Sequence, residues 1–285
     1  MGECTVEIFQ IKKTEICAGL MREYKLFQIS DTHMACLDEQ SSDEERKDHI
    51  RAHGWDEMKR DFAKSAGELC DDRYNLEARE LFEMLTQHAI DIKSDALILS
   101  GDIFDRITES NLRYLKRFIA EYPLPVIYCF GNHDSMNIKG EYVNQYDRFK
   151  GIVDNPECDS TLFGEINIVT IDNGTKKITD KQIAFLEEQL RGECKILLVL
   201  HAPLNIGEFG MSLSGKLSPY FLQGVEGDSE NAFKFNEIVK NGKDKILAVL
   251  AGHIHRFCEG RINDELWQFT CSSGLIGAGR EIIIK

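Results

Sequence analysis

Five short polar clusters in this sequence combine carboxylates, imidazoles and a carboxamide, side chains that can bind divalent metal ions. The clusters begin at Asp31, Gly101, Gly131, His201 and Gly252. The carboxylate, imidazole and carboxamide residues in these clusters are Asp31, His33, Asp102, Asp105, Asn132, His133, Asp134, His201, His253 and His255. Oxygen and imidazole donors suit Mn, Fe or Zn, and two ions about 3.5–4 Å apart need a bridging group such as a carboxylate. The residue types therefore predict a hydrolase with two metal ions.

Each cluster directly follows an apolar stretch with the length and composition of a β-strand. These stretches are residues 25–30, 96–100, 126–130, 196–200 and 246–251. Ligands of α/β proteins bind at the carboxyl ends of strands. A single cluster of this kind arises easily by chance, but five in order, each behind a strand, do not. We therefore expect the clusters to meet at one site.

Residues 37–92 form a charged segment with helical spacing and no strand-like run. Ser41 and Glu44 fit a capping box that opens a first helix, and a second helix is expected near residues 75–92. Two interpretations remain open: a helical crossover that covers the sheet, or a lid that shapes the substrate cleft.

The other expected elements lie between and after the clusters. Helices are predicted after Thr108 and after Thr179, where Gln182 completes a capping box. A strand is expected at residues 166–171. Residues 203–229 have the composition of a Gly/Ser-rich loop, and the chain is expected to end in a run of strands.

Composition limits the classes of function. The 285 residues are 42% hydrophobic, which is enough for a sizeable core, and carry a net charge of −14. This acidic balance disfavours a nucleic acid polymer as partner. The nine cysteines show no C-x-x-C pair, no stretch is apolar enough to span a membrane, and residues 1–10 lack the features of a signal peptide. We therefore expect a cytoplasmic protein.

The ordered motifs are similar to those of the calcineurin-like metallophosphoesterase superfamily. They are Asp31-x-His33, Gly101-Asp102-x-x-Asp105, Gly131-Asn132-His133-Asp134, His201 and Gly252-His253-x-His255. The resemblance implies an α/β fold of two facing mixed β-sheets flanked by helices, in four layers. We expect a single domain over residues 1–285, with a helical insertion at about residues 37–92.

The resemblance also implies a role for each site residue. One metal ion would be held by Asp31, His33, Asp102 and His255, and the other by Asp102, as the bridge, with Asn132, His201 and His253. His133 would be the catalytic imidazole, oriented by Asp134, and Asp105 would hold a supporting position behind the ligands. A hydroxide between the two ions would attack phosphorus directly, and His133 would stabilise the developing charge or protonate the leaving oxygen.

The expected substrate is a small phosphodiester or phosphomonoester, and a nucleotide is one candidate. Asp134 occupies the position where the serine/threonine protein phosphatases have Glu, so protein phosphatase activity is not expected. The compact layout resembles bacterial cyclic-nucleotide-type phosphodiesterases, although the long insertion after His33 departs from the simplest of these, and a phosphodiesterase is favoured over a phosphomonoesterase. Arg106 and Arg256 flank metal clusters and are candidates for a phosphate contact; the alternative for each is an exposed cation or a structural ion pair. Two other functions remain open: a metal-dependent nuclease of the DNA-repair branch, and a non-catalytic interaction module on the same fold.

Overall fold

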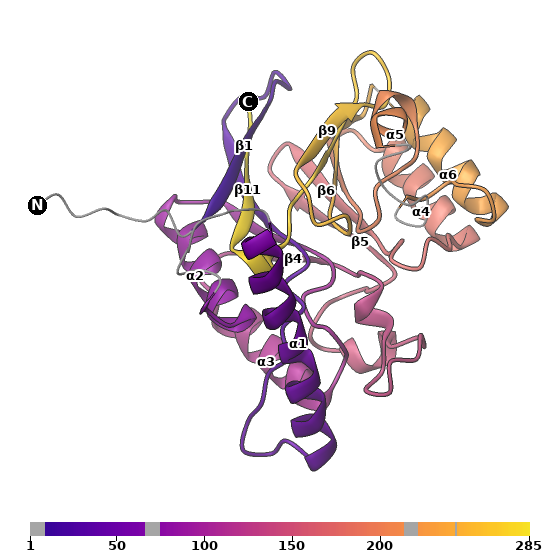
Figure 1. Cartoon of the computed structure of the whole chain (residues 1–285). Coiled ribbons are helices and arrows are strands. Elements are labelled where there is room, and N and C mark those ends of the chain that lie inside the picture. The colour runs from indigo at the N-terminus through magenta and orange to yellow at the C-terminus, as the bar shows by residue number, and fades with distance from the viewer. Residues whose placement is uncertain (1–8, 66–74, 214–221, 243) are drawn as a thin grey trace, which may run out of the picture.

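The computed structural model describes residues 9–65, 75–213, 222–242 and 244–285, and it contains two mixed β-sheets between two groups of helices (Figure 1). The first sheet has five strands in the order β1-β11-β2-β3-β4. These strands are β1 (Gln10–Ile16), β2 (Tyr24–Ile29), β3 (Ala96–Ser100), β4 (Val126–Cys129) and β11 (Ala278–Ile284). Neighbouring strands are parallel except for the antiparallel pair β11 and β2.

The second sheet has six strands in the order β5-β6-β7-β8-β10-β9. These strands are β5 (Cys158–Phe163), β6 (Ile166–Ile171), β7 (Lys195–Val199), β8 (Ile246–Ala251), β9 (Cys258–Arg261) and β10 (Trp267–Thr270). The central strands run parallel, and the two edge strands β5 and β9 are antiparallel to their neighbours. Both sheets are therefore mixed, as expected.

The described residues also form several α-helices. They are α1 (Asp43–Ser65), α2 (Ala78–Asp91), α3 (Glu109–Glu121), α4 (Asp180–Arg191), α5 (Gly207–Leu213) and α6 (Glu230–Asn241). Short 3-10 helices include η2 (His133–Ser135), η3 (Tyr146–Phe149) and η5 (Gly274–Ile276). In Figure 1, α1, α2 and α3 lie beside the five-stranded sheet, and α4 and α6 beside the six-stranded sheet.

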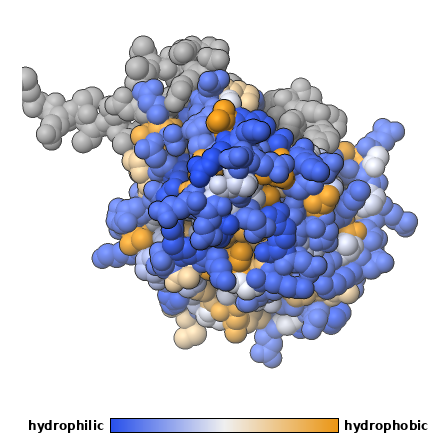
Figure 2. All heavy atoms as spheres, turned by 90° about the horizontal axis from the view of Figure 1, so that it is seen from below, coloured by the Kyte–Doolittle hydropathy of each residue, from blue (hydrophilic) through white to orange (hydrophobic). Residues whose placement is uncertain are grey.

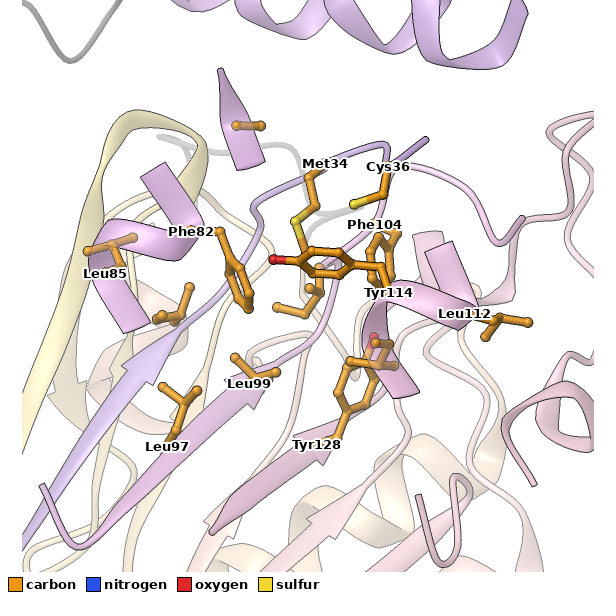
Figure 3. Close-up of a cluster of buried hydrophobic side chains, with 14 of the residues drawn as sticks. Met34, Cys36, Phe82, Leu85, Leu97, Leu99, Phe104, Leu112, Tyr114 and Tyr128 are labelled. Carbon is orange, nitrogen blue, oxygen red and sulfur yellow. The ribbon is translucent and has the colours of Figure 1, made fainter. Parts of the chain in front are cut away.

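Three hydrophobic cores hold these layers together. Leu26 and Ile98 of the first sheet pack against Leu197 and Leu250 of the second, so the two sheets face each other. The opposite face of the five-stranded sheet packs against α2 and α3; Figure 3 shows Leu97 and Leu99 below Phe82 and Tyr114 in this core. The outer face of the six-stranded sheet packs against α4 and α6 in the same way. The alternation of side chains along each strand produces this four-layer arrangement.

Helix starts agree with the capping signals at two places and differ at a third. The side chain of Thr108 accepts the Asn111 amide at the start of α3, and Thr179 forms a capping box with Gln182 at the start of α4. The expected box between Ser41 and Glu44 is wrong by one residue: the amide of Ser42 donates to Glu45 Oε2 at 2.7 Å and the amide of Glu45 to Ser42 Oγ at 3.2 Å. Ser41 instead accepts the Asp38 amide, and this turn moves the helix start forward.

Two elements differ from the sequence prediction. Strand β5 was not expected because Asp159, Ser160 and Thr161 interrupt its apolar pattern, and it forms an edge of the sheet. The short helix α5 lies in the segment predicted as a loop.

No described helix is long and apolar enough to cross a membrane. The face of the molecule seen in Figure 2 is mostly hydrophilic, with hydrophobic residues dispersed over it.

Candidate metal centre and active site

The five polar clusters meet where the carboxyl ends of both sheets come together. Asp31, Asp102 and Asn132 follow β2, β3 and β4 of the five-stranded sheet, whereas His201 and His253 follow β7 and β8 of the other sheet. The site is thus formed between the edges of two sheets. All seven candidate ligands are buried except His255, which is half-buried.

The candidate ligands form two groups that share neighbours. In the first group, His255 Nε2 lies 3.1 Å from His33 Nε2 and 3.3 Å from Asp31 Oδ1. In the second, His201 Nε2 lies 3.2 Å from each of three atoms: Asp102 Oδ2, Asn132 Oδ1 and His253 Nδ1. His33 and Asp102 also lie close enough to His133 to form a third possible ligand group. The structure therefore brings all seven residues together in the grouping that the motifs imply.

These donor atoms fit a cation better than they fit one another. The Nε2 atoms of His33 and His255 face each other at 3.1 Å. Two imidazole lone pairs at that distance repel unless a proton or a metal ion lies between them. Imidazole nitrogen and carboxylate oxygen are donors suited to divalent first-row metals. The set fits divalent ions on its own chemistry.

The backbone at the site is strained. Seven non-glycine residues in the described part of the chain have positive φ angles, and five of them are candidate ligands. These five are Asp31 (55°), His33 (48°), Asp102 (53°), His253 (67°) and His255 (51°). A non-glycine residue in this region costs on the order of 1–3 kcal/mol, and such strain gathers at functional sites. The concentration of strain at the ligands supports a functional role for this cluster.

Two glycines let the strand-end loops approach closely. A Cβ atom on Gly131 would overlap Asp102 Oδ1, and one on Gly252 would overlap the Ser30 hydroxyl. Any larger residue at either position would push the loops apart. The glycines that precede Asn132 and His253 in the motifs are thus explained by close packing.

His133 is oriented by Asp105, not by Asp134 as expected. Its Nδ1 atom lies 2.8 Å from the backbone oxygen of Asp105 and 3.2 Å from Asp105 Oδ1. Asp134 points to other groups: it accepts the amides of Gly131 and Asp102 at 2.8 and 3.0 Å and the hydroxyl of Tyr128 at 2.8 Å. The resemblance implied that Asp134 orients His133, but in the structure the side chains of these two residues of η2 contact different groups.

The charges of the site favour a protonated His133. Burial lowers the pKa of its imidazole, but Asp102 and Asp105 outweigh burial and raise that pKa to about 9. Burial raises the pKa of Asp31, but His255 and His201 lower it to about 2. Burial and the charge of Asp102 raise the pKa of Asp134 to about 7. Asp31 is thus an anion at neutral pH, while the Asp134 carboxyl is less acidic than an ordinary one.

Helix α1 contributes two site residues that the sequence analysis missed. Trp55 Nε1 donates to Asp105 Oδ1 at 2.6 Å, and Arg51 Nη2 donates to Asp105 Oδ2. The Trp55 ring also stacks on His33, with centroids 4.7 Å apart and planes 17° apart. The four-residue spacing of Arg51 and Trp55 places them on one helix face, but nothing in the sequence shows where that face points.

The two arginines proposed for substrate binding differ in position. Arg106 donates to Asp48 Oδ1 at 3.0 Å and to the backbone oxygen of Ile138 at 2.9 Å. Asp48 is on α1, so Arg106 holds the insertion in place, and this contact agrees with the alternative of a structural ion pair. Arg256 is exposed and lines the cavity beside the cluster.

A cavity of about 580 Å³ opens beside the candidate ligands. Asp102, Asn132, His133 and His253 lie on its polar side, and Trp55 and Met58 of α1 lie on another. Its size is typical of sites for small organic ligands. The insertion therefore does more than cover the sheet, because α1 forms part of the cavity wall.

Comparison with protein families identifies the chain. A model of the family described as calcineurin-like phosphoesterase matches residues 24–257, which include all five clusters. The chain belongs to this family. The match confirms the resemblance inferred from the motifs.

Relatives of this calcineurin-like phosphoesterase are distant in sequence. A probable glycerophosphodiester phosphodiesterase GpdQ from Arcobacter nitrofigilis is 26% identical over 215 residues, covering 72% of this chain and 70% of that protein. A dimetal phosphatase from Danio rerio is similar in structure, with a TM-score of 0.53, 12% identity and 88% of each chain covered. A purple acid phosphatase from yellow lupin (Lupinus luteus) seeds has a TM-score of 0.52 and 12% identity over 91% of this chain and 45% of that one. The two structures support the fold.

Membership of this family indicates the general class of reaction at the site. Calcineurin-like phosphoesterases hydrolyse phosphate esters, and the family implies divalent metal ions. This chain brings together clustered His and Asp side chains that can hold such ions. The expectations of a hydrolase and of a metal site are therefore confirmed at this level.

Proposed function

We propose that this chain is a phosphoesterase that holds two divalent metal ions and prefers phosphodiesters to phosphomonoesters. One observation carries the proposal: Asp102 shares one possible ligand group with His201 and His253 and another with His33 and His133, and His33 shares a third with Asp31 and His255. Mn, Fe and Zn all suit these donors. The relative named as a glycerophosphodiester phosphodiesterase supports the diester preference.

Each ligand has a place in this proposal. Asp31, His33 and His255 would hold one ion, and Asn132, His201 and His253 the other, with Asp102 shared. When bound, the two ions would polarise the phosphoryl oxygens and lower the pKa of a water molecule. Asp134 would act as a positioning residue, since it accepts the backbone amides of Gly131 and Asp102.

His133 would supply the proton that the leaving group needs. Its Nδ1 atom is engaged by Asp105, which leaves Nε2 for the substrate. A proton on Nε2 would pass to the oxygen of the departing alcohol as its bond to phosphorus breaks. The carboxylate of Asp105 would hold the ring in place and stabilise its charged form.

A small phosphorylated substrate and a cytoplasmic setting belong to the same proposal. The cavity accommodates a small organic ester, and the net charge of −14 opposes a long nucleic acid. The structure shows no disulfide among the described cysteines, which fits a reducing compartment.

The test compares bis-p-nitrophenyl phosphate with p-nitrophenyl phosphate, with Mn²⁺ added and with EDTA as the control. We expect faster hydrolysis of the diester and loss of activity in EDTA. A preference for the monoester would overturn the diester assignment. Absence of activity on both esters, in protein shown to hold two ions, would count against a broad phosphoesterase.

A further inference from the structure

Six large apolar side chains are among those that line the 580 Å³ cavity. We call these residues the apolar wall: Trp55, Met58, Tyr142, Ile254, Leu275 and Ile276. They come from α1, from the loop after β4, from the loop after β8 and from η5. Segments far apart in sequence thus place apolar groups on the same cavity, directly beside the candidate ligands.

Some side chains of the apolar wall are buried in the protein, and others are exposed to solvent. Leu275 is part of the core that packs on the five-stranded sheet, and Ile254 packs with Phe209 and Leu222 in a smaller core. Met58 and Tyr142, in contrast, are 52% and 51% exposed. Large apolar side chains that remain exposed beside a site gain free energy when a ligand covers them.

Two polar groups near the wall, those of Lys59 and Ser273, are already engaged. Lys59 Nζ lies 2.6 Å from Asp56 Oδ1 and donates to the backbone oxygen of Leu76 at 2.5 Å. The hydroxyl of Ser273 donates to the backbone oxygen of Asp31 at 2.5 Å. Arg256 is the exposed cation on this cavity. The hydroxyl groups of a sugar or of glycerol would lose water here and find few replacement partners.

We propose that the organic group of the bound ester is apolar, an aryl group or an alkyl chain of several carbons, and that the apolar wall binds it. The inference rests on the proposed function, because the phosphoryl group must lie at the candidate ligands for the organic group to reach the wall. It narrows the substrate class from any small phosphoester to those with an apolar group next to phosphorus.

The test measures binding, not turnover. Inorganic phosphate and methyl, propyl, butyl and hexyl phosphate are titrated by calorimetry into the Mn²⁺-loaded protein. We expect the affinity to rise about two- to fourfold for each added methylene group, the factor that burial of that group provides. Glycerol 3-phosphate, which has the three-carbon skeleton of propyl phosphate, is expected to bind more weakly than propyl phosphate.

Two substitutions test whether the apolar wall causes the dependence of affinity on chain length. Met58→Ser and Ile276→Ser should each reduce the ratio of hexyl to methyl phosphate affinity at least threefold and leave the affinity for inorganic phosphate unchanged. Leu162→Ser is the matched control, because Leu162 is 66% exposed on β5 and does not line the cavity. It should leave the ratio unchanged.

The outcomes separate the two proposals. If inorganic phosphate does not bind to the metal-loaded protein, the proposed function fails. If phosphate binds but affinity does not increase with chain length, or glycerol 3-phosphate binds as tightly as propyl phosphate, the apolar wall is overturned as a binding surface while the proposed function stands. A length effect that survives both Met58→Ser and Ile276→Ser would also overturn it.

Discussion

The loops that follow the strands of both sheets carry candidate ligands, but the contacts that hold these ligands in place differ between the two sheets. On the five-stranded side, His33 and His133 lie against Asp105 and Trp55, and α1 supports both. On the six-stranded side, support comes across the site: His201 Nδ1 contacts the backbone oxygen of Ser100, and the amide of His253 donates to Asp31. The six-stranded side also has support of its own, because the His201 amide donates to Asn173 Oδ1 at 2.9 Å, but it depends in addition on contacts with the five-stranded side.

This difference predicts separate roles for the residues that follow the two sheets, which we call the five-stranded half and the six-stranded half of the site. The five-stranded half contains His133, its partner Asp105 and the shared Asp102, so it has the groups proposed to move or stabilise a proton. The six-stranded half contributes His201, His253 and His255, which are proposed metal ligands. We therefore expect substitutions of His133 and Asp105 to affect turnover, and substitutions of the imidazole ligands in the six-stranded half to affect metal content.

The largest effect should come from removing one imidazole from each half. His133→Ala should lower kcat about 10²–10⁴-fold, the usual contribution of a general acid, with metal content nearly intact. His253→Ala should lower metal content and lose activity for that reason. Metal analysis by mass spectrometry, together with kcat on bis-p-nitrophenyl phosphate, checks both. Near-normal turnover in His133→Ala would show that its assigned role is wrong.

A second prediction contrasts the two carboxylates near His133. Asp105→Asn removes the anion beside Nδ1, so the pKa of His133 should fall from its raised value of about 9. Because the protonated form donates, activity is lost as pH rises through that pKa, and the alkaline limb of the kcat profile should move to lower pH. We expect a decrease in kcat of about tenfold to a hundredfold.

Asp134→Asn provides the comparison. Asp134 accepts two backbone amides and the Tyr128 hydroxyl, so its replacement should lower the free energy of unfolding by about 1–3 kcal/mol. The alkaline limb should stay in place. If Asp134→Asn moves that limb and Asp105→Asn does not, the carboxylate expected from sequence is the functional partner after all.

Much of the fold could be predicted because the strands are buried. The bounds of β3, β6 and β8 match the predicted stretches to the residue, since each is rich in apolar residues and bordered by charged residues or glycine. Strand β5 was missed because half of it is polar, and its pairing with β6 depends on the rest of the sheet. The periodicity of apolar residues reflects which side chains are buried, and the side chains of this edge strand are buried too little to produce that pattern.

The ligand cluster could also be predicted, because each residue follows a strand that fixes its position. The structure places all seven residues together, and their roles stay predictions. The choice between Asp105 and Asp134 could not be made, because it depends on how the turn at η2 orients two neighbouring side chains. Arg51 and Trp55 lie about 50 residues from Asp105 in sequence, so their contact depends on how α1 docks.

A smaller effect should follow from loosening the support by α1. Trp55→Phe keeps a ring against His33 but loses the donor to Asp105, and Arg51→Ala leaves Asp105 with one donor fewer. We expect each to lower kcat about three- to tenfold through misplacement of His133. The decrease should be larger for an alkyl leaving group than for p-nitrophenolate, because a good leaving group needs less proton donation. Equal decreases for both would indicate a general structural effect.

The smallest effects should come from removing helix caps, one beside each sheet. The two substitutions test whether the stability of the helices beside the five-stranded sheet affects activity at the site. Thr108→Ala and Thr179→Ala each remove a side-chain cap and should lower the free energy of unfolding by about 1 kcal/mol. Thr108 begins α3, whose Asn111 donates to the backbone oxygen of Arg106, one residue after Asp105. Thr108→Ala should therefore also lower kcat slightly, up to about twofold, while Thr179→Ala leaves it unchanged. Denaturant unfolding and kcat, measured on both variants, would show whether stability and activity separate on the six-stranded side and remain linked on the five-stranded side.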